Sequence, residues 1–314
     1  RELVDGLPIP VLTTWRAIDY LPEEHASYFG RPGSLAGRAP NFIQQNADWL
    51  LCIGARLDRL QLGFNGRLFA REARRIVVDV DAAEIAKLDL EVHQAIEADA
   101  LDLLEELARQ QDRISARKDE AWLSRCADWK SRYRLPEAVT GAADGLVGTY
   151  DLLDALSEAL TGQDLLVPGS SGSCAEVTAQ AFRVKEGQRV FFSPGLGSMG
   201  FGLPASIGAC VASGRRRTVT VIGDGGLQHN IQELETASRL ALPLKIFILD
   251  NGGYGSIRIT QDRYFGGNRV LCDPESGLTF PPLDRVAHAY RLSFTRIDQA
   301  SDLEEKVRAF LDAP

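Results

Sequence analysis

Short apolar runs rich in β-branched residues alternate with segments of helical period along most of the sequence. This alternation is typical of α/β folds, in which helices connect parallel strands. In the first third, strands are predicted at residues 11–15, 49–54 and 75–79, and helices at residues 83–90 and 100–109. We therefore expect an α/β fold built from doubly wound parallel sheets.

The alternation is clearest after residue 149. Strands are predicted at residues 165–168, 190–193, 219–222 and 244–249. Helices are predicted at residues 150–160, 175–182, 198–212 and 227–240, and a helix–strand–helix set at residues 283–311. The second half of the chain is therefore expected to form its own doubly wound sheet.

Between these two regions, residues 111–148 are rich in charge, predict one helix near residues 120–133 and end in a glycine-rich stretch. Such a composition favours an interdomain connection. We therefore expect a first Rossmann-like domain at residues 1–110, a connection at 111–148 and a ligand-binding domain at 149–314. Because the sequence lacks an initiator Met and ends on a predicted helix, we expect a fragment of a longer chain, truncated at the N-terminus.

Composition excludes several classes of protein. Hydrophobic residues make up 45% of the chain and charged residues 25%, which is enough for a packed core. The net charge of −8 disfavours a nucleic-acid partner. We expect neither a membrane span nor a signal peptide. The five cysteines form no CxxC pair and no zinc pattern, so we expect a cytoplasmic protein with free thiols.

The sequence Gly-Asp-Gly-Gly at residues 223–226 follows a predicted strand. Its glycines let a ligand approach the backbone, and the N–H groups that begin the next helix suit a phosphate. Asp224 stands at the carboxyl end of the strand, where ligands bind in open parallel sheets. Because such a sequence also occurs as a plain turn, this loop alone does not decide between a turn and a ligand site.

A second glycine-rich loop, Asp-Asn-Gly-Gly-Tyr-Gly at residues 250–255, follows the next strand. Neighbouring strand ends lie side by side in a doubly wound sheet, so Asp224 and Asn251 would offer oxygens to one cation and Gly253 a carbonyl. Magnesium takes few protein oxygens and keeps phosphate and water in its other positions. The two loops therefore predict a Mg²⁺–diphosphate site with Asp224, Asn251 and Gly253 as metal ligands.

These two loops, with Asn251 twenty-seven positions after Asp224, resemble the thiamin diphosphate motif of the acetolactate synthase and pyruvate decarboxylase family. The intervening residues 232–237 and 242–245 are also similar to that family. Asp250 is a departure, because the family commonly has Asn there. The spacing argues against the alternative of a different Rossmann-like nucleotide binder that uses residues 223–226.

Residues 195–209 resemble the family's helix under the thiazolium ring. The resemblance implies one residue of catalytic consequence in this chain, Met199, as the hydrophobic wedge that bends the cofactor and brings its 4′-imino nitrogen against C2. Met199 is the only methionine in the sequence, and its soft, unbranched side chain suits a wedge. A gap-filling core methionine is the alternative interpretation.

Residues 168–172 correspond to the family's loop at the diphosphate, where Ser170 and Ser171 replace a Gln and a His. Their hydroxyls are expected to donate to phosphate, and a plain serine-rich turn is the alternative. The complete set of cofactor-binding residues implied by the resemblance is Gly169, Ser170, Ser171, Gly197, Met199, Gly223, Asp224, Gly225, Gly226, Asn251, Gly253 and Tyr254.

Residues 11–15, 48–56 and 76–86 resemble the family's central domain, which binds FAD in acetolactate synthase and often nothing elsewhere. The region has no G-x-G-x-x-G sequence, so FAD is left open. In the family, the Glu that contacts the cofactor's pyrimidine comes from an N-terminal domain of the neighbouring subunit, and no residue here replaces it. A homodimer or homotetramer is expected on the same grounds.

The resemblance implies a thiamin-diphosphate- and Mg²⁺-dependent transferase that decarboxylates a 2-oxo acid, with pyruvate expected, and transfers the two-carbon unit to a carbonyl acceptor. Two alternatives stay open: a 2-oxo acid or oxalyl-CoA-type decarboxylase or lyase, and a cofactor-binding fragment without activity of its own. Acetolactate synthases carry a Trp where this chain has Thr260, which argues against strict acetolactate synthase specificity. Residues 258–267 are expected to cover the cofactor, whereas His229 is interpreted as a surface or packed histidine.

Overall fold

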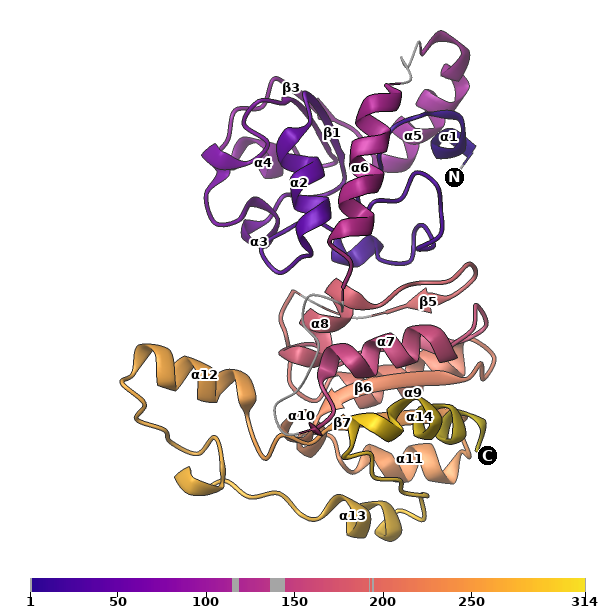
Figure 1. Cartoon of the computed structure of the whole chain (residues 1–314), viewed down its shortest axis with the longest axis vertical. Helices are drawn as coiled ribbons and strands as arrows, with labels where there is room; N and C mark the ends of the chain where they lie inside the picture. Colours follow the sequence, from indigo (N-terminus) through magenta and orange to yellow (C-terminus); the bar gives the residue numbers. More distant parts are fainter. Residues whose placement is uncertain (1, 115–118, 136–144, 192, 194, 314) are drawn as a thin grey trace. The chain divides into compact units, whose positions relative to one another are not determined.

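A computed structural model of the chain describes residues 2–114, 119–135, 145–191, 193 and 195–313. The chain divides into two compact units, residues 1–138 and 139–314 (Figure 1). Both units contain a parallel sheet with helices, which confirms the predicted α/β class. Among the described residues, no helix combines the length and the apolar character needed to cross a membrane.

The first unit contains a three-stranded parallel sheet in the order β1-β2-β3. The strands are β1 (Trp49–Ile53), β2 (Arg74–Asp79) and β3 (Gln94–Glu97). Cys52 pairs with Val77 across the first two strands, and both side chains are buried in one core cluster with Phe69 and Ile85. The apolar β-branched runs therefore form the sheet, as the sequence pattern predicts.

The described part of the first unit contains six α-helices. They are α1 (Glu2–Gly6), α2 (Arg38–Asn46), α3 (Arg59–Leu62), α4 (Ala82–Ala86), α5 (Ala100–Arg109) and α6 (Glu120–Arg132), of which α4 packs on β2 and β3. The side chains of Asp58, Asp81, Asp99 and Asp119 accept backbone N–H groups at the N-termini of α3 to α6. These aspartates satisfy amides that a helix start leaves unpaired.

Helix α6 falls in the segment expected to connect two domains. It packs against α2 within the first unit, where the ring of Phe42 meets the rings of Trp129 and Tyr133 edge to face. Residues 115–118 and 136–144 of the expected connection lie outside the described residues. The boundaries of the two domains and of the connection, at residues 110 and 148, therefore stay a prediction.

The strand predicted at residues 11–15 is wrong. Val11 forms only an isolated parallel bridge with Tyr28, and Trp15–Ala17 is a 3-10 helix. The Thr13 N–H donates to the Gly30 carbonyl at 3.1 Å and not to the Phe29 carbonyl that a regular parallel ladder would use, so the pairing does not extend. The short strand β3 was not predicted, because its four residues carry little apolar pattern.

The second unit contains a four-stranded parallel sheet in the order β5-β4-β6-β7. The strands are β4 (Leu165–Leu166), β5 (Arg189–Val190), β6 (Thr218–Gly223) and β7 (Leu244–Leu249). Residue 192 of the strand predicted at 190–193 lies outside the described residues. Because β4 and β7 flank β6, the loops after these three strands emerge at one edge of the sheet.

Helices pack on this sheet in two groups: α7 contacts α8 and α14, while α9 contacts β6 and α11. The described helices of the unit are α7 (Thr149–Ala159), α8 (Ser173–Ala181), α9 (Gly202–Ala212), α10 (Asp224–Gln228), α11 (Glu233–Arg239), α12 (Gly255–Tyr264), α13 (Leu283–Ala289) and α14 (Leu303–Asp312). In Figure 1, α12 extends away from the sheet of this unit.

Three sequence predictions in this unit need correction. The helix predicted at 227–240 is split into α10 and α11, with a turn between them. The helix predicted from residue 198 begins at Gly202, because Gly200 has a φ of +84° that no α-helix accommodates. No strand forms between α13 and α14 in the described residues, since that segment has no hydrogen-bonded neighbour in the sheet.

Candidate functional site

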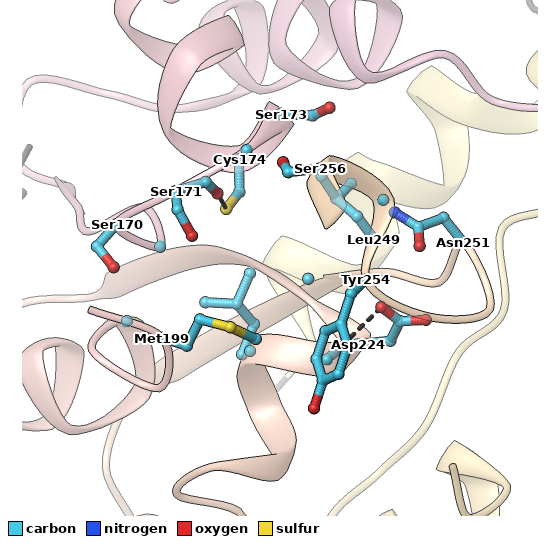
Figure 2. A pocket seen from close by; sticks show the side chains of 18 of the residues that line it. Ser170, Ser171, Ser173, Cys174, Met199, Asp224, Leu249, Asn251, Tyr254 and Ser256 are labelled. Atoms are coloured by element: carbon cyan, nitrogen blue, oxygen red, sulfur yellow. Dashed lines mark hydrogen bonds between the residues drawn. The ribbon is translucent and has the colours of Figure 1, made fainter. Parts of the chain in front are cut away.

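A cavity of about 370 Å³ lies at the carboxyl edge of the second sheet. Its walls come from the segments after β4, β6 and β7, from residues 199–203 and from the start of α12, and Figure 2 shows side chains that line it. Every residue predicted to bind the cofactor lines this cavity except Gly197, where a Cβ would lie 3.6 Å from the Ser170 carbonyl oxygen. The volume is in the range of small-molecule sites.

The Asp224 carboxylate joins the ends of two strands. It is 2% exposed; one oxygen accepts the Gly225 N–H at 2.7 Å and the other accepts the Gly253 N–H at 2.9 Å. Burial raises the pKa of the Asp224 carboxyl above its usual range, although both N–H groups lower that pKa in part. Each oxygen keeps a lone pair beyond these bonds, so the carboxylate can still bind a cation.

Gly253 is a position that only glycine fits. Its φ is +145°, and a Cβ would lie 2.2 Å from the Cys272 carbonyl oxygen. The neighbouring Tyr254 N–H donates to that carbonyl at 2.9 Å, so the loop after β7 is seated on residues far along the chain. Asn251 lies exposed in the same loop and lines the cavity.

Asp224, Asn251 and Gly253 thus line one cavity, and their oxygen-bearing groups are a carboxylate, an amide and a backbone carbonyl. This donor set fits Mg²⁺, which takes few protein oxygens beside phosphate and water. The described residues contain no group of three or more His, Cys, Asp or Glu side chains that could hold a metal ion. Within this donor set, Asp224 supplies the one carboxylate.

The segment after β4 gives the cavity a helix N-terminus. Gly172, with a φ of +65°, precedes α8, and Ser173 and Cys174 of its first turn line the cavity with Glu176. The first N–H groups of a nine-residue helix such as α8 suit an anion. Figure 2 shows the thiol of Cys174 turned back to the Ser171 carbonyl, to which it donates. Burial raises the pKa of the Cys174 thiol, so it stays protonated.

The two serines predicted to bind phosphate differ in their surroundings. Ser171 is exposed at the cavity. Ser170 is 8% exposed, and its hydroxyl donates to the Ser198 carbonyl. The Ser170 proton is therefore committed to the protein backbone, whereas the Ser171 hydroxyl can meet a ligand.

Met199 also lines the cavity and is 37% exposed, and the carbonyl of the residue before it, Ser198, accepts the Ser170 hydroxyl. Tyr254 packs on Gly225, where a Cβ would lie 2.5 Å from the tyrosine ring, and meets the Phe280 ring edge to face. His229 is exposed, with its ring centroid 6.5 Å from that of Tyr254. Nothing in these contacts gives His229 a chemical role.

Sequence reasoning missed several residues that line the cavity: Cys174, Glu176, Ser256 and Ile257. Arg258 donates to the Asn251 carbonyl at 3.1 Å. Residues 258–267, expected to cover the cofactor, belong largely to α12, and two of them, Arg258 and Ile259, line the cavity. The missed residues lie within about ten positions after the end of β4 or β7, and this position was the signal that could have identified them.

Two family models match the chain. Residues 170–314 match the thiamine pyrophosphate enzyme C-terminal TPP binding domain, and residues 1–107 match the thiamine pyrophosphate enzyme central domain. Together the two models cover most of the chain, and the C-terminal one includes every cavity-lining residue except Gly169.

Curated relatives agree with this result. The acetolactate synthase isozyme 1 large subunit of Escherichia coli is 34% identical over 314 residues, which cover 100% of this chain and 54% of the relative. The acetolactate synthase large subunit of Cyanidium caldarium is 29% identical over 317 residues, covering 100% of this chain and 53% of the relative. A probable acetolactate synthase large subunit of Methanocaldococcus jannaschii is 30% identical over 312 residues, covering 98% and 51%.

The chain thus spans about half the length of the curated relatives it matches. Its two compact units correspond in order to the two matched models. The cavity lies in the unit whose model is described as TPP binding. The chain belongs to the thiamine pyrophosphate enzyme family.

Proposed function

We propose that the cavity of the second unit binds thiamin diphosphate together with Mg²⁺. The observation that carries this proposal is the convergence of Asp224, Asn251, Gly253 and Met199 on one cavity in a chain of this family. The oxygen donors suit a cation that bridges to a diphosphate. Met199 lies on the cavity wall as an apolar surface for the organic part of the cofactor.

Each part of the site then has a physical task. Asp224, Asn251 and the Gly253 carbonyl hold Mg²⁺, while the N-terminus of α8 and the Ser171 hydroxyl receive the diphosphate. Met199 supports the rings and fixes their relative orientation. The cofactor, when bound, supplies the carbanion stabilisation that removal of CO₂ from a 2-oxo acid requires.

We propose that the whole protein decarboxylates a 2-oxo acid, with pyruvate as the first candidate, and transfers the two-carbon unit to a carbonyl acceptor. The similarity to proteins named acetolactate synthase supports this reaction class. Thr260 supports a different acceptor preference, because it is exposed and its hydroxyl donates to the Ser256 carbonyl, where the resembling enzymes carry an indole ring.

A product assay tests this reaction. The protein is incubated with pyruvate, thiamin diphosphate and Mg²⁺, with and without a second 2-oxo acid or an aldehyde. Acetolactate or a related ligation product supports transfer. Formation of acetaldehyde and CO₂ alone would contradict transfer and indicate the decarboxylase alternative. Cofactor binding without any product would indicate a cofactor-binding fragment without activity of its own.

Self-association into a homodimer or homotetramer is a further part of the proposal. Its support is a group of exposed apolar side chains on α12 and just after it, which a subunit contact would cover. They are Ile257, Ile259, Tyr264, Phe265, Val270 and Leu271. Sedimentation equilibrium measures the oligomeric state directly.

FAD binding by the first unit is a separate question, which a titration of the protein with FAD tests.

A further inference from the structure

Met199 sits on a turn whose two flanking carbonyls are both held by side chains from elsewhere in the unit. The Ser170 hydroxyl donates to the Ser198 carbonyl. The Asn230 amide nitrogen donates to the Gly200 carbonyl at 2.9 Å. Ser170 follows β4 and Asn230 follows α10, so two separate segments hold the turn on either side of the methionine.

The same turn is packed too closely to shift without disturbing its neighbours. At Gly200, a Cβ would lie 2.6 Å from the Asn230 amide nitrogen and 2.7 Å from the His229 Cβ. At Gly202, a Cβ would lie 2.4 Å from an Ile222 methyl group and 3.2 Å from the Gly169 Cα. The backbone around Met199 therefore lies directly on the segment after β4, on the end of β6 and on the turn after α10.

This arrangement matters because the methionine side chain cannot fix its own position. Met has three rotatable side-chain bonds, and Met199 is 37% exposed at the cavity wall. Its place in the cavity therefore depends on the backbone that carries it. Ser170 and Asn230 hold that backbone through one hydrogen bond each.

We propose that Ser170 and Asn230 are positioning residues that present Met199 to the organic rings of the bound cofactor. This inference rests on the proposed function of the cavity and assigns Ser170 a task other than phosphate binding. The diphosphate and the cation are bound by other residues, so losing either hydrogen bond affects recognition of the rings and leaves recognition of the diphosphate unchanged.

The single methionine of the chain makes this placement directly measurable. The protein is labelled with ¹³C-methyl methionine, and the Met199→Leu variant assigns the signal, since any methionine added for expression persists in that variant. In Ser170→Ala and Asn230→Ala, the Met199 methyl signal should move toward the position of free methionine. Asn230→Asp, which keeps the side-chain shape without the amide donor, provides a second test of the Asn230 bond.

Two substitutions of the same kind serve as controls. Ser213→Ala removes a hydroxyl bond to the Cys210 carbonyl, and Asn46→Ala removes an amide bond to the Phe42 carbonyl in the first unit. Both should leave the Met199 methyl signal in its wild-type position. Far-UV circular dichroism confirms that each variant is folded.

Calorimetric titrations with two probes then separate ring recognition from general damage. With Mg²⁺ present, Ser170→Ala and Asn230→Ala should each weaken thiamin diphosphate binding about five- to tenfold, the effect of one hydrogen bond. Binding of inorganic diphosphate should stay within about twofold of wild type.

A methyl signal unchanged in both variants overturns the inference, as does equal weakening of both probes, which indicates a structural role only. A wild-type protein that binds neither probe refutes the proposed cofactor site. In that case the methyl signal still decides whether Ser170 and Asn230 hold the turn, so the two failures are distinguishable.

Discussion

At the scale of single residues, the Asp224 carboxylate is central because it has two tasks. It accepts the N–H groups of Gly225 and Gly253 from two loops and faces the cavity with its remaining lone pairs. Replacing it by asparagine places an amide where two N–H donors converge, so one buried donor loses its partner. That loss costs about 1–3 kcal/mol.

We expect Asp224→Asn to abolish the Mg²⁺ dependence of thiamin diphosphate binding and to lower the free energy of unfolding by about 2 kcal/mol. Calorimetry and urea denaturation measure the two effects. Asp250→Asn is the matched control at the neighbouring strand end, and its Mg²⁺ dependence should persist. Undiminished Mg²⁺-dependent affinity in Asp224→Asn would remove Asp224 from the metal site.

Gly253 gives a second residue-scale prediction. Gly253→Ala introduces a Cβ 2.2 Å from the Cys272 carbonyl at a φ of +145°, and we expect it to destabilise the fold by about 3 kcal/mol. Gly252→Ala is the control, because its φ is +72° and no atom lies within 4 Å of the added carbon, so only about 1 kcal/mol of backbone strain remains. Urea denaturation compares the two, and equal costs would contradict the close approach at Gly253.

Most of the candidate site could be predicted from sequence, because its residues stand at strand ends. The strand β7 (Leu244–Leu249) is long and apolar, so the position of Asn251 at its end follows from the pattern. The bond between Ser170 and the Ser198 carbonyl could not be predicted, because it joins residues 28 positions apart that meet only through the packing of α9 on the sheet.

At the scale of elements, the segment after α12 is tied to the cavity through Arg269. The Arg269 guanidinium pairs with Asp262 near the end of α12 and with Asp273, which caps the next 3-10 helix. Asp273 follows Cys272, whose carbonyl accepts the Tyr254 N–H. One side chain thus connects α12 to the loop that contains Gly253.

We expect Arg269→Gln to increase hydrogen exchange at the Tyr254 amide and in the last turn of α12, because both lose an anchored neighbour. Hydrogen exchange read by mass spectrometry or NMR measures this. Arg263→Gln provides a control on the same helix, since its guanidinium lies over the Tyr264 ring. Equal protection of the Tyr254 amide in Arg269→Gln and wild type would show that the connection has no effect.

Elements with strong periodicity could be predicted nearly to the residue, and those set by tertiary contact could not. Helix α5 (Ala100–Arg109) has both an aspartate cap and an apolar stripe. Helix α12 contains glycine, serine and threonine and no continuous apolar face, so its sequence favours a loop. The late start of α9 depends on the positive φ of Gly200, which the segment after α10 imposes by close packing.

At the scale of the whole molecule, an ion pair joins three elements of the second unit. The Arg217 guanidinium donates to both Asp164 oxygens, at 2.6 and 2.8 Å, and to the Leu311 carbonyl of α14. Burial alone would raise the pKa of Asp164, but the bonds from Arg217 and Thr161 outweigh it and hold that pKa below its usual range. This pair therefore stabilises the fold when Asp164 is ionised.

The sign of the pH dependence follows from that lowered pKa. The stabilisation is fully present above the unfolded-state pKa of about 3.9 and is lost as the pH falls through the lower pKa of the folded state. We expect Asp164→Asn to cost about 2 kcal/mol at neutral pH and to flatten the loss of stability below about pH 4. Urea denaturation at several pH values measures both effects. If the variant lost stability at acid pH as steeply as wild type, Asp164 would not be the source of this pH dependence.

The central claim is that the loops after β4, β6 and β7 form a Mg²⁺-dependent thiamin diphosphate site. Calorimetric titration of this chain with thiamin diphosphate, with and without Mg²⁺, tests it most directly. Saturable binding of one cofactor per chain that requires Mg²⁺ is the predicted result. Absence of binding under both conditions, or equal affinity without the metal, would contradict the account.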